Sequence, residues 1–218
     1  METSVLCRLN SAVEKYGDKI AYKDPENSLT FSQFNDLTRS IGTYLARLVP
    51  AGAPVVVMSG RHIFTPACFL GVVRAGCFYA PMDGDMPVTR LNQILGVIKA
   101  DYMLVDKAHL DIAQGLEFRG TIFVMEDIID YPASDELLEQ REKTLICTSP
   151  LYVIFTSGST GVPKGVITSH QSLMTYIDSV SKVSISTTLT FSATSRRSII
   201  SPLSEIFISR SAAALRPL

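Results

Sequence analysis

A loop near residue 160 is rich in glycine and hydroxyl side chains and carries the most distinctive chemistry in the sequence. Its candidate ligand-binding residues are Thr156, Ser157, Gly158, Ser159, Thr160, Gly161 and Lys164. Glycines let backbone N–H groups approach a ligand closely, hydroxyls add short donors, and lysine supplies a point charge that suits phosphate. Residues 156–165 contain no carboxylate. This combination predicts a cradle for a polyphosphate.

Two short apolar runs flank the loop. Residues 152–155 read Y-V-I-F and residues 166–167 read V-I, and both runs are typical of strands. The order strand, loop, strand differs from the Walker-type phosphate loop, in which G-x-x-x-x-G-K-[ST] leads into a helix. Lys164 instead follows a proline and precedes a glycine. The spacing therefore excludes a GTPase-like site.

The elements that must position this loop alternate between helices and strands. Thr30 and Gln33 have the spacing of a capping box. The apolar residues that follow recur at helical spacing: Phe34, Leu37, Ile41, Leu45 and Leu48. Residues 54–58 form a continuous apolar run, as in a strand that is covered on both faces.

Three further helices are predicted: one over residues 63–75, one that begins at Pro87 and one over residues 109–114. Two further strands are predicted, over residues 102–105 and 121–125. Gly76 suits the C-terminal cap of the first of these helices. Residues 127–142 are polar and acidic and are predicted to be a surface connection. Alternating strands and helices favour an α/β layered fold with a largely parallel sheet.

Composition excludes several classes of protein. With 218 residues, 46% of them hydrophobic, and a net charge of −1, we expect one large or two small domains and neither a nucleic-acid nor a membrane partner. The N-terminus lacks a basic segment followed by an apolar run, so we expect no signal peptide. Four cysteines without C-x-x-C spacing favour a reduced, cytoplasmic protein without a metal site.

The ten residues 156–165, T-S-G-S-T-G-V-P-K-G, resemble the phosphate-loop signature of the adenylate-forming (AMP-forming) ligases. A Ser/Gly-rich linker would not account for ten residues in register. Residues 73–83, V-R-A-G-C-F-Y-A-P-M-D, resemble a second motif of the same family. The resemblance is closest to amino-acid adenylation domains of peptide synthetases and to D-alanine–carrier protein ligases, and it assigns residues 1–183 to part of such a domain.

This resemblance implies the N-terminal part of the family's large domain and an ATP-dependent reaction. The family joins a carboxylate to AMP with release of pyrophosphate, and a carrier-protein or CoA thiol then takes the acyl group. The loop residues named above would hold the β- and γ-phosphates of ATP. Mg²⁺ is expected as the counter-ion of ATP, with its protein ligand, the adenine site and the catalytic lysine beyond residue 218. The chain is accordingly expected to be an inactive fragment with no catalytic residue.

Residues 184–218 have a different character from the rest of the chain. They contain one acidic residue, Glu205, no glycine and no sustained strand or helix period. One interpretation is a divergent or disordered end. The other is a frameshift near Ser184, because residues 187–198 can be read in the shifted frame as D-D-T-D-V-F-G-N-Q-S-P-L and residues 199–211 as D-Y-I-A-A-K-R-D-I-Y-I-P-L. We predict a frameshifted, disordered tail that is foreign to the family.

The shifted frame also bears on the substrate. Its Asp after P-L would lie at the acyl pocket of amino-acid-activating members, and a buried carboxylate requires a cation such as an α-ammonium group. Three hypotheses therefore remain: a fragment of an amino-acid-activating ligase, a fragment of an acyl-CoA synthetase, or a non-enzymatic, pseudogene-like or nucleotide-binding product.

Overall fold

The computed structural model describes residues 3–24, 27–60, 63–157 and 161–184 and contains two sheets. The small sheet pairs β1 (Ile20–Lys23) with β2 (Ser28–Thr30). The large sheet contains β3 (Pro54–Ser59), β4 (Phe78–Asp83), β5 (Tyr102–Val105), β6 (Thr121–Val124), β7 (Pro150–Thr156) and β8 (Lys164–Ser169). Its strand order is β6-β5-β3-β4-β7-β8, and every neighbouring pair is parallel except β7–β8. The predicted α/β fold with a largely parallel sheet is confirmed.

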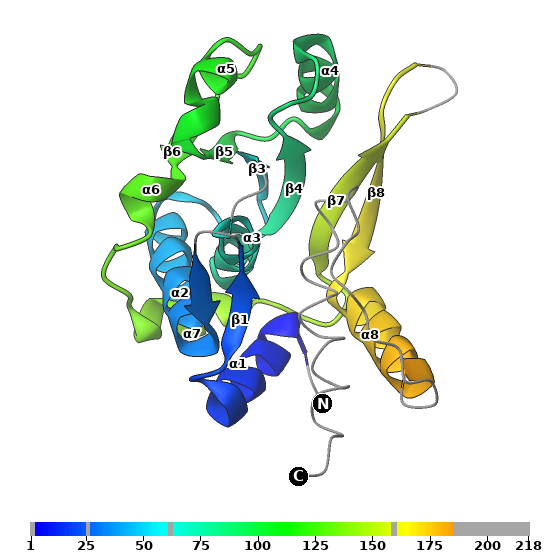
Figure 1. The fold of residues 1–218 in the computed structure, drawn as a ribbon. Coiled ribbons are helices and arrows are strands. Elements are labelled where there is room, and N and C mark those ends of the chain that lie inside the picture. The colour runs from blue at the N-terminus through cyan, green and yellow to red at the C-terminus, as the bar shows by residue number, and fades with distance from the viewer. Residues whose placement is uncertain (1–2, 25–26, 61–62, 158–160, 185–218) are drawn as a thin grey trace.

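Helices cover both faces of the large sheet (Figure 1). They are α1 (Val5–Tyr16), α2 (Phe31–Leu48), α3 (Thr65–Arg74), α4 (Val88–Ile98), α5 (Leu110–Gln114), α6 (Met125–Ile128), α7 (Asp135–Glu142) and α8 (His170–Ser184), with a short 3₁₀ helix at Lys107–His109. Apolar residues of α1, α2, α3, α6 and α8 form one buried cluster, and those of α4 and α5 form a second. Within the described ranges, no helix has the length and apolar character needed to cross a membrane.

The helix predicted after Thr30 is confirmed, with its capping box. The Thr30 hydroxyl accepts from the backbone N–H of Gln33 at 3.2 Å, and the Gln33 side chain accepts from the N–H of Thr30 at 2.9 Å. This helix, α2, crosses α3 where two glycines meet. A Cβ atom added at Gly71 would lie 2.5 Å from Cγ2 of Ile41, and one added at Gly42 would lie 2.7 Å from Cβ of Arg74. The glycines therefore set the close approach of the two helices.

Arg74, the last residue of α3, joins four helices. The residue is 4% exposed, and its guanidinium donates to Thr38 of α2 at 2.9 Å, Asn10 of α1 at 2.8 Å and Glu142 of α7 at 2.6 Å. Gly76 follows with a φ of +76°, which confirms its predicted capping role. A buried guanidinium is stable only when its donors are satisfied, so this network fixes how the helices pack.

The prediction of a surface connection over residues 127–142 is wrong in part, because the segment contains helix α7. Asp135–Glu142 reads D-E-L-L-E-Q-R-E, a run of helix-forming residues preceded by Ser134 at the N-cap. Leu138 is its only buried residue, so the segment shows no apolar stripe from which periodicity could identify a helix. The predicted frameshifted tail lies, from residue 185 onward, outside the described residues.

Candidate functional site

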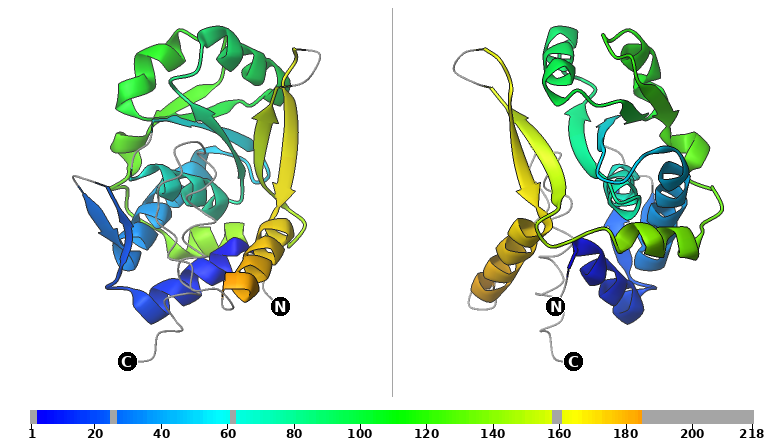
Figure 2. Two further views of the ribbon diagram at one scale, coloured as in Figure 1. Left: turned by 45° about the vertical axis from the view of Figure 1, so that its right-hand side comes forward. Right: turned by 180° about the vertical axis from the view of Figure 1, so that it is seen from behind.

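The polar loop lies at the end of a hairpin formed by β7 and β8. These strands pair antiparallel from Thr156–Lys164 at the loop to Pro150–Ser169 at the base. Both views in Figure 2 show the hairpin along one edge of the sheet, with α8 at its foot. The predicted order of strand, glycine loop and strand is therefore confirmed.

The structure brings together the first and last of the predicted ligand-binding residues. Thr156 ends β7, Lys164 begins β8, and the two are direct partners in the ladder. Both are exposed, as are Ser157 and Gly161. The other three predicted residues, Gly158, Ser159 and Thr160, lie outside the described residues. A hydroxyl and an ammonium group thus stand side by side at the mouth of the loop.

Two glycines in this region are required by geometry. Gly161 has a φ of +79°, in the left-handed region that side chains disfavour. Gly165 lies against the β7 side chains, since a Cβ atom there would be 3.0 Å from Cγ2 of Val153 and 3.2 Å from Cε1 of Phe155. Between them Pro163 is buried. The return strand of the hairpin is therefore fixed by packing where the loop ends.

Aromatic rings connect the hairpin to the second family-like segment, residues 73–83. Tyr79 of β4 stacks on Phe69 of α3 with ring centroids 4.5 Å apart, and it lies 5.6 Å from the ring of Tyr152 on β7. Tyr79 and Tyr152 are also ladder partners. Burial raises the pKa of the Tyr79 hydroxyl well above its ordinary value. These contacts hold β7, and with it Thr156, in line with the parallel strands.

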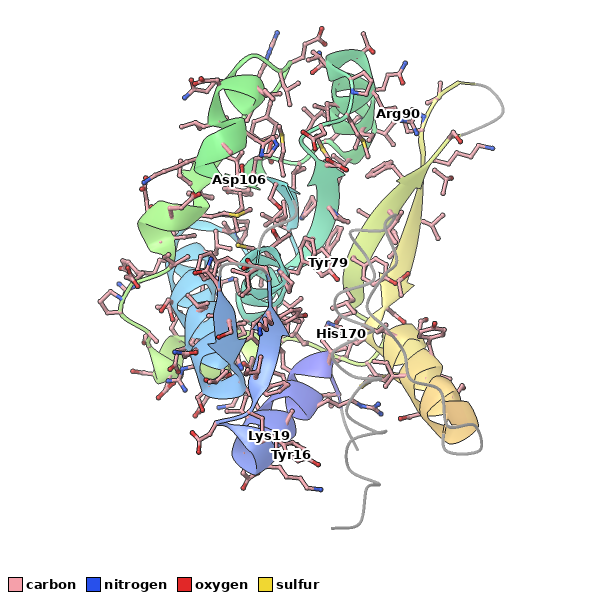
Figure 3. The ribbon with its side chains drawn as sticks, viewed as in Figure 1. Tyr16, Lys19, Tyr79, Arg90, Asp106 and His170 are labelled. Carbon is pink, nitrogen blue, oxygen red and sulfur yellow. The ribbon has the colours of Figure 1, made fainter. Side chains whose placement is uncertain are left out.

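A buried histidine anchors the opposite end of the hairpin (Figure 3). His170 is 0% exposed, and its Nδ1 accepts from the backbone N–H of Val5 at 3.3 Å. The backbone N–H of His170 donates to the carbonyl of Ser149 at 3.2 Å. Burial lowers the pKa of His170 to about 4, so the ring is neutral near pH 7. Sequence patterns do not reveal this anchor, because its partner is a backbone group 165 residues away.

A second polar cluster lies at the carboxyl ends of β3, β4 and β5. Asp106 accepts from the backbone N–H of Gly60 at 2.9 Å, and its other carboxylate oxygen lies 2.6 Å from Nδ1 of His109. The His109 ring fills the space beside Gly84, where an added Cβ atom would be 2.1 Å from Cδ2 of the ring. The cluster joins the loops that follow these strands.

The donors of the hairpin loop suit phosphate but do not suit a metal ion. Backbone N–H groups, hydroxyls and Lys164 bind phosphate oxygens, whereas Mg²⁺ prefers carboxylate oxygen. In the part of the chain that the structure describes, no group of three or more His, Cys, Asp or Glu side chains is placed to hold a metal ion.

Comparison with known proteins identifies relatives of the chain. The family model described as "AMP-binding enzyme" matches residues 9–213. The nonribosomal peptide synthetase dtxS1 of Metarhizium robertsii is 31% identical over 162 residues, which are 72% of this chain and 2% of that protein. The dapdiamide synthesis protein DdaD of Enterobacter agglomerans is 30% identical over 183 residues, 82% of this chain and 28% of that protein. The chain thus spans less than a third of either relative.

Solved structures share the fold. VinN in complex with L-aspartate has a TM-score of 0.74 at 19% identity, over 95% of this chain and 61% of that one. The nonribosomal peptide synthetase FmoA3 in its AMPPNP-bound form has a TM-score of 0.69 at 22% identity, over 83% of this chain and 19% of that one. A fatty acid AMP ligase from Legionella pneumophila has a TM-score of 0.67 at 21% identity, over 82% of this chain and 32% of that one. At these identities the likeness concerns the fold alone.

Proposed function

Because the chain belongs to the family of AMP-binding enzymes, we propose that its β7–β8 hairpin binds the β- and γ-phosphates of ATP in an adenylation reaction. The observation that carries this proposal is the pairing of Thr156 with Lys164 at the mouth of a carboxylate-free loop. Ser157 and Gly161 are exposed at the same mouth. Gly158, Ser159 and Thr160 complete the proposed set of donors.

In the proposed reaction a carboxylate oxygen attacks the α-phosphorus of ATP. The bond between the α-phosphorus and the bridging oxygen breaks, and its electron pair leaves with pyrophosphate. The loop would hold the two phosphates that become pyrophosphate, and its positive charge would offset the charge that develops on them. Mg²⁺ would arrive with ATP as a counter-ion that polarises the phosphates.

We further propose that the carboxylate is an amino acid and that the product passes to a carrier-protein thiol. The curated relatives support this substrate class, because the nonribosomal peptide synthetase dtxS1 is among them. The likeness to a fatty acid AMP ligase keeps a fatty acid as the competing substrate. CoA remains the alternative acceptor.

The proposed frameshift near Ser184 bears on the same substrate. The family model matches through residue 213, which includes most of the segment that we assign to a shifted frame, so the comparison does not decide between the two frames. Sequencing the genomic DNA around codon 184 decides between them. The proposal requires the shifted frame to encode D-V-F-G-N-Q-S-P-L-D-Y and to continue; an immediate stop would refute it.

The phosphate role is tested by titrating the 218-residue chain with ATP in a calorimeter. Replacing Lys164 by Ala should weaken ATP binding about tenfold, since a charge-assisted hydrogen bond contributes about 1.5 kcal/mol or more. Lys143→Ala is the matched control, because Lys143 is an exposed lysine that directly follows α7. Helix α7 lies at the other end of the molecule from the loop (Figure 1). Equal affinities of the Lys164→Ala variant and the unsubstituted chain would remove Lys164 from the site.

The substrate class is tested separately, by ATP–pyrophosphate exchange in the protein translated with the frame restored. We expect exchange with an amino acid and none with fatty acids. Exchange that depends only on fatty acids would refute the amino-acid proposal and leave the phosphate role standing.

A further inference from the structure

We propose that Arg90, in the first turn of α4, is a second cationic ligand for the phosphate groups held at the hairpin loop. This inference rests on the proposed function and adds to it a residue that lies outside the glycine loop and well before it in sequence. Its sequence context, M-P-V-T-R-L, resembles a position of the family for which a structural role is expected. The position of α4 in the fold indicates a role in phosphate binding for Arg90.

Packing places the first turn of α4 beside the loop. Helix α4 is in contact with β8, its Leu91 belongs to the same buried cluster as Val153, and Phe155 packs against that cluster. Phe155 directly precedes Thr156, at the mouth of the loop. Figure 3 shows Arg90 between α4 and the upper part of the hairpin. We infer that the guanidinium faces the end of the hairpin where Thr156 and Lys164 pair.

The surroundings of Arg90 leave its charge available. The residue is half-buried, and across the described ranges no acidic side chain pairs with its guanidinium. The other partly or fully buried arginines have partners: Arg8, Arg39 and Arg74 pair with acidic side chains, and Arg141 donates to the backbone carbonyls of Ala46 and Val49. The backbone N–H of Arg90 donates to the carbonyl of Pro87 at 2.8 Å and so closes the first turn of the helix.

Its position on the helix is unfavourable unless an anion is present. The N-terminal turn of a helix carries partial positive charge and disfavours a cation, and the first turn of α4 contains no acidic residue that would compensate. A phosphate group would meet both the helix end and the guanidinium. The planar guanidinium can also bind two phosphate oxygens at once in a fixed fork, whereas the ammonium group of Lys164 acts as a point charge.

The test measures binding of inorganic tripolyphosphate and of ATP to the 218-residue chain by calorimetry at low salt, with adenosine as the ligand that lacks phosphate. Arg90→Gln keeps most of the side-chain stem and removes the charge; Arg90→Lys keeps the charge and removes the planar fork. We expect Arg90→Gln to weaken tripolyphosphate and ATP about tenfold, Arg90→Lys to weaken both by less, and added salt to reduce both losses. Lys143→Ala should change neither affinity.

The outcomes distinguish a failure of the inference about Arg90 from a failure of the proposed phosphate role of the loop. If the unsubstituted chain binds tripolyphosphate, Lys164→Ala weakens it and Arg90→Gln does not, Arg90 is structural and the inference alone is overturned. If the unsubstituted chain does not bind tripolyphosphate, the phosphate role of the loop fails and the inference fails with it. Thermal melts of each variant identify a loss of folding. If Arg90→Gln does not fold, Arg90→Met, which keeps an uncharged stem of similar length, takes its place: equal affinity for tripolyphosphate then overturns the inference, and weaker affinity supports it.

Discussion

Acidification from about pH 7.5 to about pH 4 should destabilise the folded chain through His170. In the fold, Nδ1 of the ring accepts from the backbone N–H of Val5, and the side chain is fully buried. Protonation would place a second hydrogen between these two nitrogens and a charge in an apolar site. The neutral ring therefore carries its hydrogen on Nε2, which has no hydrogen-bond partner among the described residues.

The size of the effect follows from the change in pKa. In the unfolded chain His170 has its ordinary pKa of 6.5, whereas burial lowers the folded value to about 4. Below pH 6.5 His170 binds a proton in the unfolded state but stays neutral in the folded state. The contribution of the neutral ring to the unfolding free energy is therefore fully present above pH 6.5 and is lost as the pH falls towards 4. At about 1.4 kcal/mol for each pH unit, the loss is about 3 kcal/mol.

The assay is urea denaturation, followed by circular dichroism, at a series of pH values between about 7.5 and about 4. Other groups titrate in this range, so the informative quantity is the difference in unfolding free energy between the unsubstituted chain and His170→Asn. The Asn side chain can accept from Val5 but does not titrate. At about pH 7.5 we expect His170→Asn to be less stable by about 2 kcal/mol, because it leaves part of the ring's volume empty.

That difference should vanish and reverse on acidification, since only the unsubstituted chain loses the contribution of the neutral ring. Two stability curves that stay parallel from about pH 7.5 to about pH 4 would refute the reasoning. Such a result would mean that His170 accepts a proton in the folded state as readily as in the unfolded one.

Two further predictions concern packing and association. Gly71→Ala should lower the unfolding free energy in urea denaturation by about 1–3 kcal/mol, because the new methyl group meets Ile41 at 2.5 Å; Gly96→Ala, with nothing within 4 Å, should be neutral or stabilising, and equal effects of the two would contradict the argument. Ile167 is 63% exposed on the outer strand β8, so Ile167→Lys should reduce self-association in sedimentation velocity without loss of stability. Tyr176→Lys, at a residue 53% exposed on α8, is the control, and an equal reduction there would show that added charge, not the strand edge, is responsible.

Local signals predict most of the elements correctly. The capping box at Thr30 and Gln33 and the continuous apolar run at residues 54–58 are properties of neighbouring residues, and both appear in the structure as predicted. The segment over residues 127–142 reads as a connection because α7 buries only Leu138. A helix held to the protein mainly through polar contacts, such as that of Glu142 with Arg74, has no apolar period to detect.

The candidate site likewise has features that the local sequence predicts and features that only the tertiary structure shows. Residue types and spacing alone determined the glycine loop, its donors and its flanking strands, because a phosphate cradle is assembled from groups that are adjacent in sequence. Only the tertiary structure decided that β7 and β8 form the edge of the large sheet, that Tyr79 holds β7 in place, and that His170 ties the base of the hairpin to Val5. These contacts join residues far apart in the chain. No local pattern specifies them, because they arise when burial of the apolar faces brings the elements together.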